Sequence, residues 1–185
     1  MIVGLTGRNA SGKGTVAAWL QARGFRYLSL SDAIRDHLRA QGLEPTRDRM
    51  ILAGRAMRTE GGAGVLAERT LAVLDPGTDA IVDSVRNPAE VEVLRRRADF
   101  VLVEVHADEQ TRYSRLNERA RAGDAKDFEE FQRQEAAELQ SGDLAAQQLI
   151  ATAALADLVL TNDGDVPELE ARLEALLATW RANAA

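Results

Sequence analysis

Short apolar runs alternate with longer segments of mixed polarity along the chain. The apolar runs cover residues 2–6, 25–30, 80–83, 100–105 and 158–161. Each run is short and bounded by turn residues, so each predicts a buried β-strand. In the segments between them, apolar residues recur three or four positions apart, which is typical of amphipathic helices. The alternation predicts an α/β fold with a five-stranded parallel sheet and helices on both faces.

Capping residues and glycines set the expected helix boundaries. Asn87-Pro88-Ala89-Glu90 and Asp165-Val166-Pro167-Glu168 each combine a cap, an early proline and a glutamate three residues after the cap, a pattern that starts helices. Ser31 is expected to cap a helix that ends near Gly42. A further helix is expected over residues 145–155.

The chain is expected to form one domain over residues 1–185, because it contains no internal repeat and no linker rich in Gly, Ser or Pro. Two stretches are predicted as insertions over one sheet edge. The first covers about 31–75, between the second and third strands. The second covers about 108–140, is polar and arginine-rich, and is expected to break near Gly123-Asp124.

Composition limits the classes of function. The chain has 23 Lys and Arg against 29 Asp and Glu, a net charge of −6, which disfavours a nucleic-acid-binding role. It has no cysteine, which excludes disulfides, Cys-ligated zinc and Cys nucleophiles. His37 and His106 have no partner at metal-ligand spacing. No transmembrane run or secretory signal is expected, so a cytoplasmic enzyme or binding protein is the prediction.

A glycine-rich turn joins the first predicted strand to the first predicted helix. Such a turn lets backbone N–H groups surround a polyphosphate, and the helix start adds partial positive charge. Lys13, one of two lysines in the chain, is expected to reach the β- and γ-phosphates. Gly14 stands where Ser or Thr is usual in this loop, and Thr15 comes one position later. The residues expected to bind ATP are Gly7, Asn9, Ala10, Ser11, Gly12, Lys13, Gly14 and Thr15.

Asp83 ends the third predicted strand, so it lies at the carboxyl edge of the sheet. If the first and third strands are neighbours, its carboxylate lies beside the phosphate loop. With Thr15 it can then hold Mg²⁺, partly through water. A simple helix cap is the alternative role of Asp83.

Several arginines are expected near the same edge. Arg35 and Arg86 each follow a strand closely, and each is either a contact to an anionic acceptor or a solvated side chain. For Arg58, before a glycine cluster, an acceptor contact and a surface charge stay equally open. Arg115 and Arg119 share one helix face with Arg112. Three like charges on one face repel unless an anion lies opposite, although Glu118 and Asp108 could also balance them.

These segments resemble the nucleoside monophosphate kinases, such as adenylate kinase. The loop Gly-x-x-x-x-Gly-Lys-Gly-Thr, the segment Ser31-Asp32-Ala33-Ile34-Arg35 and the segment Asp83-Ser84-Val85-Arg86 carry the resemblance. Ser31 stands where those kinases usually have Gly. The third segment is one residue shorter than theirs, which is closer to a group of prokaryotic nucleotide-kinase-like proteins. Dephospho-coenzyme A kinase is similar in overall layout.

The resemblance implies roles for these residues. Asp32, Arg35, Arg58 and Arg86 would bind the acceptor, and Asp83 would lie near Mg²⁺. Arg115 and Arg119 would belong to a lid, the 108–140 insertion, and would act on the transferred phosphoryl group together with Lys13. Arg121 and Arg133 are further lid candidates. Asn162 and Gly164 would lie against the purine of ATP, although a plain turn before a helix is equally open for them.

The expected reaction is phosphoryl transfer from ATP, with Mg²⁺, to a small nucleotide, and a (deoxy)nucleoside monophosphate matches best. A dephospho-coenzyme A kinase or another hydroxyl kinase is the alternative, in which Asp32 would take the hydroxyl proton. A nucleotide-dependent regulatory ATPase is an alternative of another class. The expected partners are small nucleotides, with neither membrane nor nucleic acid, and the oligomeric state is left open.

Overall fold

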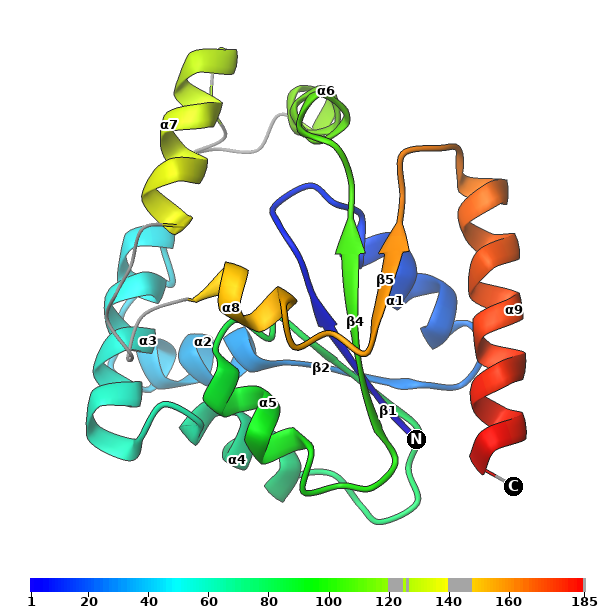
Figure 1. Ribbon diagram of the computed structural model, residues 1–185. Helices are drawn as coiled ribbons and strands as arrows, with labels where there is room; N and C mark the ends of the chain where they lie inside the picture. The colour runs from blue at the N-terminus through cyan, green and yellow to red at the C-terminus, as the bar shows by residue number, and fades with distance from the viewer. Residues whose placement is uncertain (120–124, 126, 140–147, 185) are drawn as a thin grey trace.

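The computed structural model has an α/β fold whose five strands form one sheet in the order β2-β3-β1-β4-β5. The strands are β1 (Ile2–Thr6), β2 (Arg26–Ser29), β3 (Ala80–Asp83), β4 (Phe100–His106) and β5 (Leu158–Thr161). Every pairing is parallel, and helices cover both faces (Figure 1). The predicted fold class is therefore confirmed. The structure describes residues 1–119, 125, 127–139 and 148–184.

The helices lie between the strands at the expected places. They are α1 (Lys13–Gln21), α2 (Leu30–Ala40), α3 (Arg47–Gly61), α4 (Val65–Ala72), α5 (Pro88–Leu94), α6 (Glu109–Arg119), α7 (Phe128–Leu139), α8 (Leu149–Ala153) and α9 (Val166–Ala184). Helix α2 begins one residue before the expected cap, because Ser29 rather than Ser31 is the N-cap and its hydroxyl accepts from Ser31 N. The expected break at Gly123-Asp124 lies outside the described residues.

The position of β1 in the centre of the sheet arranges the site. Gly4 pairs with Val82 of β3 on one side and with Leu102 of β4 on the other. In a parallel sheet the carboxyl ends of neighbouring strands meet at one edge. The ends of β3 and β4 therefore flank the loop that follows β1.

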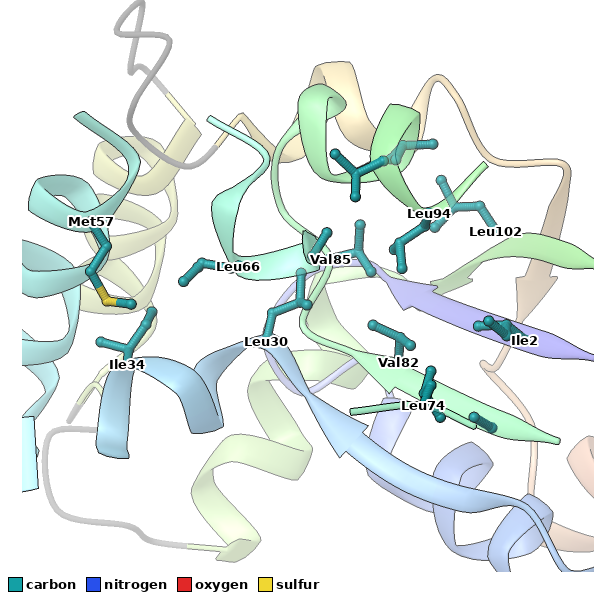
Figure 2. Packing of buried hydrophobic residues seen from close by; sticks show 14 of the residues in the cluster. Ile2, Leu30, Ile34, Met57, Leu66, Leu74, Val82, Val85, Leu94 and Leu102 are labelled. Atoms are coloured by element: carbon teal, nitrogen blue, oxygen red, sulfur yellow. The ribbon is translucent and has the colours of Figure 1, made fainter. Parts of the chain in front are cut away.

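Two hydrophobic cores hold the helices against the sheet. One core packs α2, α4 and α5 on the first face, and Figure 2 shows its labelled members Leu30, Leu66, Val82 and Leu102 around the strands. The second core packs α1 and α9 on the opposite face. Side chains alternate between the two faces along each strand, so β1, β3 and β4 each contribute to both cores.

A third, small cluster lies under α6 and α7. Leu116 and Phe131 are buried in it, and Tyr113 and Phe128 pack against it. Ala10 of the glycine-rich loop packs against the same cluster. This contact joins α6 and α7 to the loop. Among the described helices, none has the length and apolar character that a membrane span requires.

Candidate functional site

The loop after β1 has the backbone that its glycines predict. Gly7 and Gly12 have φ angles of 126° and 102°, and Gly12 is the N-cap of α1. A Cβ at Gly7 would lie 2.3 Å from Val105 O, and a Cβ at Gly12 would lie 2.0 Å from Asn162 Nδ2. A side chain at either position is therefore excluded both by conformation and by space. Ala10 also has a positive φ, 60°, which stores strain at the loop.

Lys13 lies folded over this loop. Its ammonium Nζ donates to Gly7 O and to Arg8 O, each at 2.8 Å. Both acceptors belong to the first part of the loop, so the ammonium lies across its mouth. Gly14 and Thr15 are exposed at the start of α1. The loop thus offers a cation and a helix N-terminus to an anion.

Asp83 lies at the end of β3, beside the loop. Tyr27 OH donates to its Oδ2 at 2.9 Å, and Ser84 N donates to its Oδ1 at 2.6 Å. Burial, followed by the charge of Asp83, raises the pKa of Tyr27 to about 12, so this hydroxyl stays protonated and holds the carboxylate. The sequence offered no signal for Tyr27, because the contact joins two strands.

Asp83 lies on the same face of the sheet as α1. Ile81, two residues earlier, belongs to the core under α1, and the alternation of the strand gives Asp83 the same side. Thr15, on the first turn of α1, supplies an exposed hydroxyl. Carboxylate and hydroxyl oxygens fit Mg²⁺. These two residues would hold the ion, which would neutralise phosphate charge when bound.

Helix α6 brings two arginines to the loop. Arg119 Nη2 donates to Asn9 Oδ1 at 3.2 Å. Arg115 Nη1 lies 3.9 Å from the position of a Cβ at Gly12. That nitrogen is buried and has no hydrogen-bond partner among the described residues. A buried N–H without an acceptor is costly, so this nitrogen could donate to an anion held at the loop.

Arg112, on the same helix, has a different environment. It is buried, and its Nε donates to Ala107 O at 3.0 Å. Its Nη1 and Nη2 both donate to Glu135 of α7. Glu135 also accepts from Arg8 Nη1 at 3.1 Å. Glu135 therefore joins α6, α7 and the loop, a role that the sequence did not indicate.

Of the further lid candidates, Arg133 lies on α7 and is exposed, and Arg121 lies outside the described residues.

The expected acceptor residues divide into two environments. Asp32 Oδ1 accepts from Arg35 Nη1 at 2.5 Å, and both side chains are about half exposed on α2. Arg58 is buried, and its Nε and Nη2 donate to Glu90 Oε1 at 3.0 and 2.7 Å. This buried pair joins α3 to α5. Arg86 is partly buried, and its carbonyl accepts from Gln148 N beside α8.

Glu90 has more contacts than its capping role predicts. Its Oε2 accepts from Arg86 N and Asn87 N at 2.8 and 3.1 Å, which completes the expected capping box. Burial raises the pKa of Glu90, while Arg58 and the two amides oppose that shift. The Arg58 contact could not be read from the capping pattern, because it joins two helices.

Asn162 contacts the loop backbone. It is buried, and its Nδ2 donates to Ser11 O at 2.8 Å. Its own N donates to His106 O. Gly164 lies so close to Glu168 that a Cβ would meet Oε2 at 1.9 Å. The turn after β5 therefore supports the phosphate loop from the side of α9.

A cavity of about 450 Å³ opens beside the loop. It lies between the end of β4, the start of α6 and helix α8. The lining residues are Gly7, Arg8, Glu104, His106, Ala107, Asp108, Glu109, Arg112, Leu149, Ile150 and Ala153. No group of three or more His, Cys, Asp or Glu residues in the described part of the chain is arranged as a metal site.

Comparison with known proteins places the chain in a family. The model of the AAA domain matches residues 3–138. A UPF0200 protein of Hyperthermus butylicus is 33% identical over 180 residues, which cover 96% of this chain and 94% of that protein. The chain belongs to the AAA-domain and UPF0200 families. A second UPF0200 protein, from Pyrococcus furiosus, is 32% identical over 185 residues, and the match covers 96% of this chain and 96% of that protein.

Solved structures confirm the fold of this UPF0200 family member. A shikimate kinase from Bacteroides thetaiotaomicron matches with a TM-score of 0.62 at 14% identity, over 98% of each chain. The Thermus thermophilus protein TT1252 matches with a TM-score of 0.61 at 24% identity, over 97% of each chain. The fold is that of P-loop kinases. The P-loop of this domain implies nucleotide binding with Mg²⁺.

Proposed function

We propose that the protein transfers the γ-phosphoryl group of ATP, with Mg²⁺, to a nucleoside monophosphate or its deoxy counterpart. The observation that carries the proposal is the buried Nη1 of Arg115 beside Gly12, which has no hydrogen-bond partner in the part of the chain that the structure describes. Two other charged groups belong to the same site: Lys13, which lies across the mouth of the loop, and Asp83, which ends the neighbouring strand β3. Three elements thus bring charged groups to one edge, as transfer of a phosphoryl group requires.

The chemistry needs positioning and charge compensation more than covalent help. Lys13 and the loop amides hold the donor phosphates. Arg115 and Arg119 bind the charge that spreads over the transferred group. Mg²⁺, held by Asp83 and Thr15, supplies further neutralisation when bound. An acceptor phosphate is already ionised near neutral pH, so no general base is needed.

The contact between Asp32 and Arg35 supports a phosphate acceptor over a hydroxyl acceptor. A hydroxyl kinase would use Asp32 to take a proton. In this structure the Asp32 carboxylate accepts from Arg35 at 2.5 Å, which orients the guanidinium. An oriented arginine at the strand edge suits a phosphate, since its planar fork matches two phosphate oxygens.

Purified protein incubated with radiolabelled ATP and Mg²⁺ tests the proposal. The acceptor panel contains ribo- and deoxyribonucleoside monophosphates, dephospho-coenzyme A and shikimate. Label is expected in a nucleoside diphosphate, and Arg115→Ala is expected to lower the rate about a hundredfold. Arg96→Ala, an exposed arginine on the surface, is the matched control. Transfer to a hydroxyl compound alone would contradict the phosphate acceptor, and hydrolysis without transfer would favour the regulatory ATPase.

A further inference from the structure

The cavity beside β4 opens next to the first residues of the glycine-rich loop. Gly7 and Arg8 line it, and the carbonyls of these two residues bind the Lys13 ammonium at 2.8 Å. A molecule in the cavity would therefore lie against the place where the transferred phosphoryl group is held. The cavity volume, about 450 Å³, falls within the range of small-molecule sites.

The two arginines in the cavity wall are already paired. Glu135 accepts from Arg8 and twice from Arg112. Arg112 is 2% exposed and its Nε is held by Ala107 O. Neither guanidinium is placed to receive a phosphate in the cavity without leaving its carboxylate. A dianionic group is therefore disfavoured inside this wall.

Two of the carboxylates in the wall also have local partners. Asp108 caps α6, and its oxygens accept from Thr111 N at 2.7 Å and Thr111 Oγ1 at 2.8 Å. Glu109 Oε1 accepts from Gln132 Nε2 at 3.1 Å. Both contacts hold the start of α6 in place. The carboxylates of Asp108 and Glu109 shape the cavity, but fewer of their oxygen lone pairs are left to accept a hydrogen bond from a ligand.

Glu104 differs from the other carboxylates in the wall. It pairs in register with Thr6 of β1, and its side chain is 20% exposed. Its Oε1 lies 4.0 Å from His106 Nδ1, which is longer than a hydrogen bond. A carboxylate keeps several acceptor sites, so Glu104 offers free lone pairs to hydrogen-bond donors on a ligand.

Thr6, the register partner of Glu104 on β1, adds an independent observation. It is 1% exposed, and its Oγ1 has no hydrogen-bond partner in the described part of the chain. Because Thr6 and Glu104 are register partners in a parallel pair, their side chains lie on the same face of the sheet. Buried hydroxyls are normally paired. The Thr6 hydroxyl beside the Glu104 carboxylate therefore points to a polar ligand.

The opposite wall of the cavity is apolar. Leu149, Ile150 and Ala153 of α8 form it. Ile150 is 60% exposed although it is a large aliphatic side chain. Arg86 lies at this end, since its carbonyl accepts from Gln148 N just before α8. The cavity therefore combines an acceptor-rich polar wall with an apolar wall.

We infer that this cavity holds the nucleoside part of the acceptor, with ribose hydroxyls donating to Glu104 and the base lying against α8. For the class of acceptor the inference rests on the proposed function. A carboxylate can accept from a ribose hydroxyl, as acidic residues do at dinucleotide sites. The acceptor phosphate then lies outside the cavity, toward the mouth of the loop. Glu104 is thus the residue that selects ribonucleotides over deoxyribonucleotides.

Steady-state kinetics with paired acceptors tests this inference. The probes are the four common ribonucleoside monophosphates and their deoxy counterparts, each with ATP and Mg²⁺. For the acceptor that the protein uses best, the wild type is expected to favour the ribo form in kcat/KM by about tenfold or more, the size of a hydrogen bond to a charged group. Glu104→Gln is expected to raise the ribo KM by a similar factor, to change kcat little, and to abolish the preference.

Glu170→Gln is the matched control, because Glu170 is exposed on α9 at the other face of the sheet. Ala153→Leu narrows the cavity without touching Glu104 and is expected to raise KM for both acceptor forms. Calorimetric binding of the same monophosphates without ATP gives a second readout. There Glu104→Gln is expected to weaken only the ribo form.

The outcomes separate the inference from the proposed function. Equal KM for both sugar forms in the wild type and in Glu104→Gln would overturn the inference and leave the function intact. A different result would be no phosphoryl transfer at all, together with tighter calorimetric binding of the ribo form that Glu104→Gln removes. That result would overturn the proposed function and keep the assignment of the cavity. A hundredfold loss of kcat in Glu104→Gln with dephospho-coenzyme A would overturn the inference, since Glu104 would then be a general base.

Discussion

Gly12 and Asn162 show how single residues set the phosphate loop. Gly12 has a left-handed backbone, and Asn162 occupies the space where any side chain at that position would lie. The same amide holds Ser11 O at 2.8 Å. The loop is thus held from outside by one buried side chain, and its function depends on residues that do not belong to the motif.

Lys13→Ala is expected to remove nearly all phosphoryl transfer while the fold remains. The ammonium would bind the β- and γ-phosphates, and loss of a preorganised charge costs on the order of a hundredfold or more in rate. Turnover at saturating ATP is the measurement, with circular dichroism to check folding. A variant that keeps more than about half of the wild-type turnover would show that the loop assignment is wrong.

Asn162→Ala is expected to raise KM for ATP and to destabilise the protein by about 1–3 kcal/mol. The substitution leaves the buried Ser11 carbonyl without its donor, and an unpaired buried group has a cost of this size. Urea denaturation and ATP titration check the two effects. If Asn162 only bound a purine, KM would rise while the free energy of unfolding stayed at the wild-type value.

Helices α2 and α6 carry arginines that are proposed for the site. Arg35 lies on α2 and pairs with Asp32. Arg115 and Arg119 lie on α6 and reach the loop at Gly12 and Asn9. Helix α7 fixes α6 through Glu135, which also binds Arg8. Helices α6 and α7 are therefore joined to the loop by polar and charged contacts as well as by the packing of Ala10.

Arg35→Ala and Arg119→Ala are expected to separate kinetically. Arg35 would grip a phosphate that is anionic throughout, so its loss mainly raises KM for the acceptor. Arg119 would bind charge that develops in the transition state, so its loss mainly lowers kcat. Steady-state kinetics with both substrates varied gives the two parameters. Similar changes in both parameters for both variants would contradict this division.

The buried pair between α3 and α5 makes a prediction about stability. Glu90→Gln is expected to lower the free energy of unfolding by about 3 kcal/mol or more, because Arg58 then stays buried without a counter-charge. Adding Arg58→Met should recover much of that loss. The exposed pair of Arg96 and Glu68 is the control, and Glu68→Gln is expected to cost less than about 1 kcal/mol. Urea unfolding measures all three, and equal losses at the two pairs would refute the argument.

The whole molecule has two different sheet edges. The carboxyl ends of the strands carry the loop, Asp83, Glu104 and the cavity. At the amino ends, the Met1 amino group lies 2.6 Å from Asp79 and 3.2 Å from Asp99, and it joins segments next to β3 and β4. One edge is thus arranged for a ligand, while charges at the other edge pair with one another and hold the central strand.

The amino edge predicts an acid-dependent part of the stability. The hydrogen bonds from Arg97, followed by those from Met1, lower the pKa of Asp99 below its usual 3.8, although burial opposes this. The folded protein therefore favours the ionised carboxylate. The contribution is complete well above pH 3.8 and is lost as pH falls toward the lower folded-state value.

Asp99→Asn is expected to lower the free energy of unfolding at neutral pH. It should also make that free energy depend less on pH in the acid range. The side chain is 35% exposed, so the effect should be below about 1 kcal/mol because solvent screens the pair. Urea midpoints for wild type and variant at about pH 7 and about pH 3 measure it. A difference between the two proteins that grows as pH falls would contradict the argument.

The sequence by itself determined the local features of this protein. Apolar runs marked the strands, capping residues marked α5 and α9, and the glycine pattern marked the phosphate loop, because each depends on neighbours in the chain. The same local pattern placed Asp83 at the end of its strand. What it left open was whether that strand lies next to β1.

Only the tertiary structure decided which distant residues meet. The contact of Arg58 with Glu90 joins positions 32 apart, and the contact of Asn162 with Ser11 joins positions 151 apart. The sequence left Arg58 open between an acceptor contact and a surface charge, and it left Asn162 open between a contact to the purine and a plain turn. Strand order depends on how crossovers pack both faces of the sheet at once, which no local pattern encodes. That order places β1 between β3 and β4, and so places Asp83 on one side of the loop and the Glu104 cavity on the other.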